Sequence, residues 1–190
     1  MFSIRPATPA DIPAILRLIR ALATYEREPD AVRATEADLM RDGFGNPPRF
    51  ECLIAESPSP AGDTQTAGFA LFFVTYSTWR GRPGIHLEDI FVEPEFRGCG
   101  IGKALLARVA ARAVEQGFDR LGWNVLEWNR PALDFYDSLG AERLEEWRLM
   151  RVTGDALHSL AASAQDTVST PARAPNDTLM SNTLTRKGAS

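Results

Sequence analysis

Cysteine and histidine are scarce in this chain, which has two of each among its 190 residues. Neither Cys52 nor Cys99 has a Cys-x-x-Cys partner or a histidine at ligand spacing, so we expect no zinc site and assign no metal. Two separated cysteines also make no disulfide framework, which favours a reducing compartment. The first residues lack the apolar segment of a secretory signal, and no hydrophobic run approaches the about 20 residues of a membrane span. The sequence therefore predicts a cytoplasmic protein that does not enter a membrane.

Basic charge is limited as well. The formal net charge is −4 and the pI is about 5.3, whereas a nucleic-acid-binding protein needs a basic surface. We therefore expect no nucleic-acid partner. An acidic surface attracts cations, although many enzymes without cationic ligands are equally acidic.

Aromatic residues are absent from Thr153 to the end, where Ser, Thr, Ala and Pro dominate. Such a segment cannot form a hydrophobic core of its own. The chain as a whole is 44% hydrophobic and 24% charged, which is typical of a globular domain. We predict one domain over residues 1–152 and a tail over 153–190, disordered after a short helix that ends near Ala162.

Helix signals in the first half of the chain are local and strong. Thr8 is placed to cap a helix, with Pro9 in its first turn and Asp11 at the third position, and apolar residues then recur at helical spacing to about Tyr25. Thr35 begins a second, shorter helix in the same way. Strand-like segments flank and follow these helices, over residues 2–5, 50–55, 67–75 and 85–92.

The second half alternates helices with strands. A long helix follows the glycine-rich segment after residue 96 and ends at Gly117, and Asn129 caps a further helix. Strands are expected over residues 120–126, 141–145 and 147–152. The order predicts an α/β (α+β) fold with a mixed, mostly antiparallel sheet of six to seven strands flanked by about four helices.

The glycine-rich segment is the most informative part of the sequence. It runs Arg97-Gly98-Cys99-Gly100-Ile101-Gly102-Lys103 and immediately precedes a helix. Glycines let backbone amides turn inward, and a helix N-terminus adds unsatisfied donors, so the segment predicts a phosphate or pyrophosphate site. A P-loop would need Ser or Thr after Lys103, and a dinucleotide fingerprint would need glycine at position 103. The spacing Arg-x-x-Gly-x-Gly resembles the pyrophosphate loop of the GNAT N-acetyltransferases, which binds coenzyme A.

Several other segments extend the resemblance to one branch of that superfamily. They are Arg5-Pro6-Ala7-Thr8, residues 15–20, Asp42-Gly43-Phe44-Gly45, residues 76–79, Leu87-Glu88-Asp89-Ile90-Phe91-Val92, Trp128-Asn129-Arg130-Pro131, Phe135-Tyr136 and Leu139-Gly140-Ala141. Together they resemble the diamine acetyltransferases, which include the spermidine/spermine and thialysine N-acetyltransferases. The resemblance covers about residues 3–152 and implies a GNAT fold, acetyl-CoA as co-substrate, a small cationic amine as acceptor and a homodimer.

The resemblance assigns roles to particular residues. Glu88 would be the general base, acting through a water, and Tyr136 the general acid for the leaving thiolate; Asp89 is a weaker candidate. Asn129 would contact pantetheine in addition to capping its helix. The residues expected to bind the coenzyme are Ile90, Phe91, Val92, Arg97, Gly98, Cys99, Gly100, Ile101, Gly102, Lys103, Asn129 and Pro131.

The acceptor amine would be bound by Tyr25, Glu26, Trp79 and Glu88, with Trp79 either covering the acceptor site or packing in the core. His86 is expected to be structural. Two departures concern the substrate: Ser77 and Thr78 stand where the polyamine enzymes have an acidic residue, and Leu144-Glu145-Glu146-Trp147 lacks the family's glycine before tryptophan. The first departure favours thialysine or another small amine. A protein or peptide acetyltransferase and a non-catalytic acyl-CoA-binding module remain alternatives.

Overall fold

The structure is a computed structural model that describes residues 1–58 and 63–166. The chain divides into two compact units, Met1–Tyr136 and Asp137–Ser190, and each is described by itself. The elements are β1 (Ser3–Pro6), a 3-10 turn (Pro9–Asp11), α1 (Ile12–Tyr25), α2 (Glu36–Phe44), β2 (Glu51–Pro58), β3 (Thr64–Ser77), β4 (Arg82–Val92), a 3-10 turn (Pro94–Phe96), α3 (Ile101–Glu115), β5 (Leu121–Trp123), α4 (Arg130–Ser138) and α5 (Gly154–Asp166).

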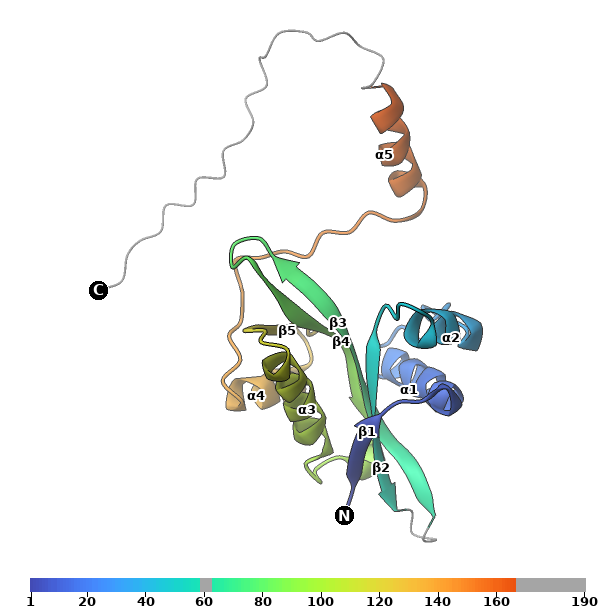
Figure 1. Cartoon of the computed structure of the whole chain (residues 1–190), viewed down its shortest axis with the longest axis vertical. Coiled ribbons are helices and arrows are strands. Elements are labelled where there is room, and N and C mark those ends of the chain that lie inside the picture. Colours follow the sequence, from blue (N-terminus) through green and yellow to red (C-terminus); the bar gives the residue numbers. More distant parts are fainter. Residues whose placement is uncertain (59–62, 167–190) are drawn as a thin grey trace, which may run out of the picture. The chain divides into compact units, whose positions relative to one another are not determined.

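The sheet of the first unit has the order β1-β2-β3-β4-β5. Its first three pairings are antiparallel, whereas β4 and β5 pair in parallel, with α3 as the crossover between them. The predicted mixed and mostly antiparallel sheet is therefore confirmed, as is the order of helices and strands up to α4. β3 and β4 form a long hairpin whose register runs from Gly68 opposite Val92 to Ser77 opposite Arg82 (Figure 1).

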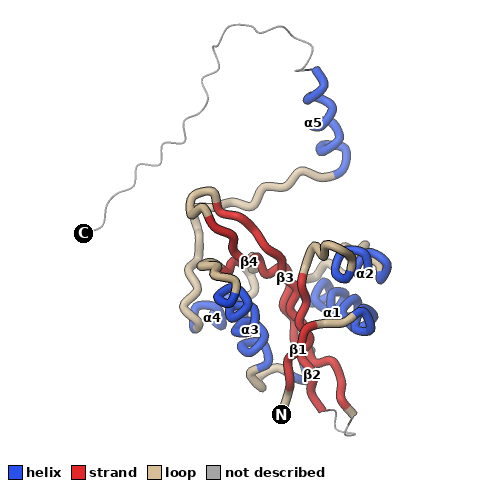
Figure 2. Tube along the Cα trace, in the orientation of Figure 1, coloured by secondary structure: helices blue, strands red, loops and turns tan. Residues whose placement is uncertain are grey.

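Helices cover both faces of this sheet, with α1 and α2 on one side and α3 on the other (Figure 2). The alternation of side chains along the strands divides the core accordingly. Ile15 and Leu18 of α1 are buried in one cluster with Phe69 of β3. Leu105 of α3 is buried in the other cluster with Phe72 of β3. The strands therefore form a fixed layer from which both helical layers are positioned.

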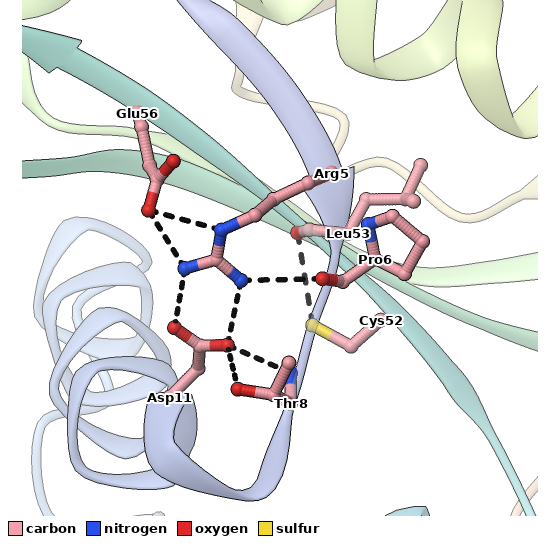
Figure 3. A network of polar contacts seen from close by, with 7 residues as sticks. All are labelled: Arg5, Pro6, Thr8, Asp11, Cys52, Leu53 and Glu56. Atoms are coloured by element: carbon pink, nitrogen blue, oxygen red, sulfur yellow. Dashed lines mark hydrogen bonds and ion pairs between the residues drawn. The ribbon is translucent and has the colours of Figure 1, made fainter.

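A charged cluster fixes the start of α1 against the first two strands (Figure 3). Arg5 on β1 donates from Nη1 and Nη2 to the two carboxylate oxygens of Asp11, at 2.8 Å each, and from Nε to Glu56 on β2 at 3.0 Å. Asp11 also accepts from the backbone amide of Thr8 at 2.7 Å, which confirms the predicted capping arrangement. The hydrogen bonds from Arg5 and Thr8 hold the pKa of the Asp11 carboxyl well below its usual range.

The second unit corrects the predicted number of strands. Segments 141–145 and 147–152 were expected to close the sheet, but within residues 137–166 there is no strand, and the described sheet has five strands instead of six or seven. Leu144, Trp147 and Leu149 are exposed. The segment has the apolar content of a strand, but an apolar pattern does not by itself supply the backbone pairing that defines one. The predicted short helix corresponds to α5, and the rest of the predicted disordered tail lies outside the described residues.

Candidate functional site

A cavity of about 640 Å³ lies within the first unit, at the end of β4. Its position follows from the pairing of the last two strands. β4 and β5 are in register only from Ile85–Leu121 to Leu87–Trp123, and beyond that point residues of both segments line the cavity. β5 is therefore shorter than the predicted strand 120–126, because the space that pairing would fill is the cavity itself. The edge of β4 that faces this space offers backbone groups that no strand covers.

An irregularity in β4 brings two carboxylates into this cavity. Leu71 on β3 lies opposite Asp89 and Phe72 lies opposite Leu87, so Glu88 is an extra residue without a partner in the register. Strict alternation predicts that Glu88 and Asp89 point to opposite faces of the sheet. The irregularity interrupts this alternation, and both residues line the cavity.

Two of the carboxylates that line the cavity, those of Asp89 and Glu26, are partly removed from solvent. Burial, together with the charges of Glu88 and Glu26, raises the pKa of Asp89 to about 6. Burial also raises the pKa of Glu26, at the end of α1. Glu88 is more exposed, and its Oε2 lies 3.7 Å from Nε2 of His86. A cation entering here would compensate the charge of all three carboxylates.

The glycine loop also lines the cavity. Gly98 and Gly100 have φ angles of +77° and +85°, which L side chains rarely adopt, and a Cβ at either position would project into open space. α3 begins at Ile101, and its N-cap, Gly100, has no side chain with which to satisfy the amides of the first turn. These amides, with Lys103 beside them in the lining, suit an anionic group such as a pyrophosphate.

Arg97 and Cys99 differ from the other residues of this loop. The Arg97 guanidinium lies over two rings, 5.0 Å from the centre of Tyr25 and 5.3 Å from that of Phe91, and its Nε donates to the Val92 carbonyl at 2.9 Å. Arg97 lines the cavity, but its side chain is already engaged by protein groups. Cys99 is exposed and is not part of the lining.

Tyr136 is positioned by α4. Its ring packs against Trp123, with ring centres 4.9 Å apart, and against Phe135 at 5.3 Å. Asn129 precedes the helix, and its Oδ1 accepts from the Ala132 amide at 3.3 Å, which confirms it as the cap. Burial, together with the charge of Glu26, raises the pKa of Tyr136. The hydroxyl therefore stays protonated at neutral pH and can donate a proton.

The structure brings together all the predicted site residues except Cys99 and Trp79. Trp79 lies in the turn between β3 and β4 and is 79% exposed, so within this chain it neither packs in the core nor lines the cavity. A turn residue has no strand or helix to direct its side chain inward, so the role predicted for Trp79 in binding the acceptor stays a prediction.

Sequence reasoning also missed some lining residues. The clearest example is Trp123, the last residue of β5, which contacts Tyr136. The predicted strand 120–126 included it, but which strand residues face the cavity depends on where β4 and β5 separate. Asp89 was considered only as a weaker candidate because the sequence does not show how far it is buried.

Comparison with known proteins agrees with this geometry. A model of the acetyltransferase (GNAT) family matches residues 13–141. The chain is 45% identical to the thialysine N-epsilon-acetyltransferase of Bos taurus over 83% of this chain and 96% of the relative. It is 36% identical to an L-ornithine N5-acetyltransferase of Arabidopsis thaliana, over 84% of this chain and 88% of that one.

A solved structure of an integron cassette protein from V. cholerae superimposes with a TM-score of 0.68, over 84% of this chain and 97% of the other. The two are 24% identical, so the likeness concerns the fold alone.

Proposed function

The chain belongs to the acetyltransferase (GNAT) family and is an acetyl-CoA-dependent N-acetyltransferase, and from this we propose that it acetylates a primary amine of a small cationic substrate, of the thialysine, ornithine or diamine type. The observation that carries the proposal is that one cavity contains the glycine loop, Tyr136 and three carboxylates. An anion site, a proton donor and a cation site are the parts that such a transfer needs.

The acceptor must lose a proton before it can react. An alkylamine has a pKa of about 10.4, so it enters the cavity as a cation. Glu26, Glu88 and Asp89 would bind this cation, and Glu88 would take its proton through a water. Asp89 is a second candidate for the base. A general base is most effective when its pKa lies near the working pH, and the pKa of Asp89 is raised to about 6.

Acetyl-CoA supplies a thioester. The free amine would attack its carbonyl carbon directly, so that the acetyl group moves to the nitrogen and the thiolate of coenzyme A leaves. Gly98, Gly100 and Lys103 would bind its pyrophosphate, and the uncovered backbone of β4 would hold the pantetheine arm and the thioester oxygen. Tyr136, kept protonated by burial, would give its proton to the departing thiolate. No residue of this chain needs to carry the acetyl group itself.

The substrate class rests on the carboxylates and on the relatives. Relatives named for thialysine and L-ornithine act on amino acids that carry a second, side-chain amine. Ser77 and Thr78 leave the segment before Trp79 without a carboxylate, which favours a short substrate with one amine at the cavity over a long polyamine.

The test is a thiol-release assay with acetyl-CoA and a panel of acceptors: thialysine, lysine, ornithine, putrescine, spermidine and a lysine-containing peptide. Tyr136→Phe and Glu88→Gln are compared with Val114→Ala and Glu142→Gln, which alter exposed residues outside the cavity. We expect turnover of a free amino acid or diamine that falls about 100-fold or more in the first pair only. Turnover of the peptide alone would overturn the proposal in favour of a protein acetyltransferase, and binding without any turnover would favour a non-catalytic module.

We also propose a homodimer in the cytoplasm. In the first unit Val74, Tyr76 and Trp79 are exposed on or beside the β3–β4 hairpin, and in the second unit Leu144 and Trp147 are exposed. Apolar surfaces of this kind are typical of protein interfaces. Light scattering coupled to size-exclusion chromatography tests this: a mass twice that of the 20.9 kDa chain supports the dimer and a monomer mass contradicts it. The exposed thiol of Cys99 suits a reducing compartment.

A further inference from the structure

Tyr25 joins two segments that both belong to the coenzyme end of the cavity. Its hydroxyl donates to Asn129 Oδ1 at 3.0 Å, across a sequence separation of 104 residues. The same oxygen accepts from the Ala132 amide in the first turn of α4. Tyr25 therefore fixes the orientation of the residue that caps α4, the helix that carries Tyr136.

The ring of Tyr25 makes a second set of contacts. The Arg97 guanidinium lies 5.0 Å from its centre, and the Trp128 ring lies 6.1 Å away at an angle of 47°. Arg27 in turn lies 4.3 Å from the centre of the Trp128 ring. The four side chains form a continuous series of contacts, in the order Arg97, Tyr25, Trp128 and Arg27, which we call the Tyr25 bridge. Such cation–aromatic contacts favour one placement of each side chain over many.

We propose that Tyr25 is a positioning residue for acetyl-CoA, holding the glycine loop through its ring and the cap of α4 through its hydroxyl. The proposal rests on the proposed function and changes the role of Tyr25, which the family resemblance assigns to the acceptor amine. Without the bridge, Arg97 loses one of the two rings beneath its guanidinium, and Asn129 loses the partner that orients its amide group. Both losses concern the coenzyme rather than the amine.

Arg97 takes part in the bridge through several contacts of its own. Its Nε is bound by the Val92 carbonyl on β4, and its charged plane is shared between the rings of Phe91 and Tyr25. The side chain thereby ties the loop that follows β4 to β4 itself and to the end of α1. In this position Arg97 shapes the glycine loop, while the loop amides and Lys103 remain to meet the pyrophosphate.

The experiment measures acetyl-CoA binding by isothermal titration calorimetry without any amine present. Tyr25→Phe removes the hydroxyl and keeps the ring, Tyr25→Leu removes both, and Val114→Ala on the exposed face of α3 is the control. We expect the Kd of acetyl-CoA to rise about fivefold in Tyr25→Phe and about 20-fold or more in Tyr25→Leu, with no change in the control. Kinetic assays should show the KM for the amine changing less than the Kd for acetyl-CoA.

A double-mutant cycle separates positioning from a general loss of structure. If Tyr25 acts through Asn129, adding Tyr25→Phe to Asn129→Ala should not weaken acetyl-CoA binding further. A Kd unchanged in both Tyr25 variants, or a full additional loss in the double variant, would overturn the bridge while leaving the acetyltransferase intact. Wild-type protein that does not bind acetyl-CoA would overturn the proposed function as well.

Discussion

Replacing Asp11 with asparagine should destabilise the first unit by a measurable and pH-dependent amount. The substitution keeps the size of the side chain but removes its charge. Arg5 then faces a neutral amide in place of a carboxylate that it contacts through two hydrogen bonds of 2.8 Å. The amide of Thr8, bound at 2.7 Å, is left with the same weaker acceptor.

The magnitude follows from the difference between charged and neutral hydrogen bonds. A bond to a charged group contributes about 1.5–3 kcal/mol and a neutral one about 0.5–1.5 kcal/mol. The side chain of Arg5 is 37% exposed, so solvent screening reduces the gain, and Asp11 at 11% exposure is the better shielded partner. We expect Asp11→Asn to lower the free energy of unfolding by about 1–2 kcal/mol, or the Tm by about 2–8 °C for a chain of this size.

The pH dependence gives the prediction its sign. The pKa of Asp11 is lowered in the folded protein, so its contribution is complete above the unfolded value of about 3.9 and is lost as the pH falls through the folded value. Urea denaturation of wild type and variant should show a constant gap between about pH 5 and 7 that narrows below about pH 4. Asp38→Asn, in the exposed capping box of α2, is the control and should have a smaller effect. A gap no larger than that of the control, or one that persists undiminished at pH 3, would refute the reasoning.

Three further predictions concern the cavity and the core. Gly100→Ala should cost about 1 kcal/mol of stability and weaken acetyl-CoA binding several-fold in calorimetry, whereas Gly117→Ala, with a similar φ of +72° at the end of α3, should cost the same stability without affecting binding. In wild type we expect kcat/KM to fall as the pH drops through about 6, because the Asp89 carboxylate is protonated below that value, and Asp89→Asn should remove this fall. The same fall in the variant, measured between pH 5 and 8, would exclude Asp89 as the base. Leu105→Ala, which truncates a fully buried side chain of α3, should lower the free energy of unfolding by about 2–5 kcal/mol in urea; a loss below about 1 kcal/mol would contradict the core assignment.

Helix ends and the glycine loop could be predicted from the sequence because their causes are local. Thr8 and Asp11 cap the first helix within one turn of chain, and the left-handed glycines at 98 and 100 need no distant partner. The resemblance then supplied the chemistry for residues whose positions were already fixed locally. Tyr136 is such a case, since its helix begins at a recognisable cap.

Features that depend on distant residues could not be predicted in the same way. The apolar residues from Leu144 to Val152 read as strands, but pairing requires a partner that the pattern itself does not supply. The irregularity that places Glu88 and Asp89 in one cavity is a property of the register between β3 and β4. The contacts of Tyr25 with Arg97 and Asn129 likewise exist only because α1, the glycine loop and α4 meet around the cavity.

The two cysteines make the protein ready for labelling without engineering. Cys99 is exposed in the glycine loop, whereas Cys52 is buried on β2, where burial raises the pKa of its thiol to about 12. A maleimide dye at neutral pH would therefore attach at Cys99 alone, because the thiolate is the reactive form. Since Cys99 adjoins the cavity without lining it, such a dye would report on occupancy of the anion site from just outside, in the unmodified sequence.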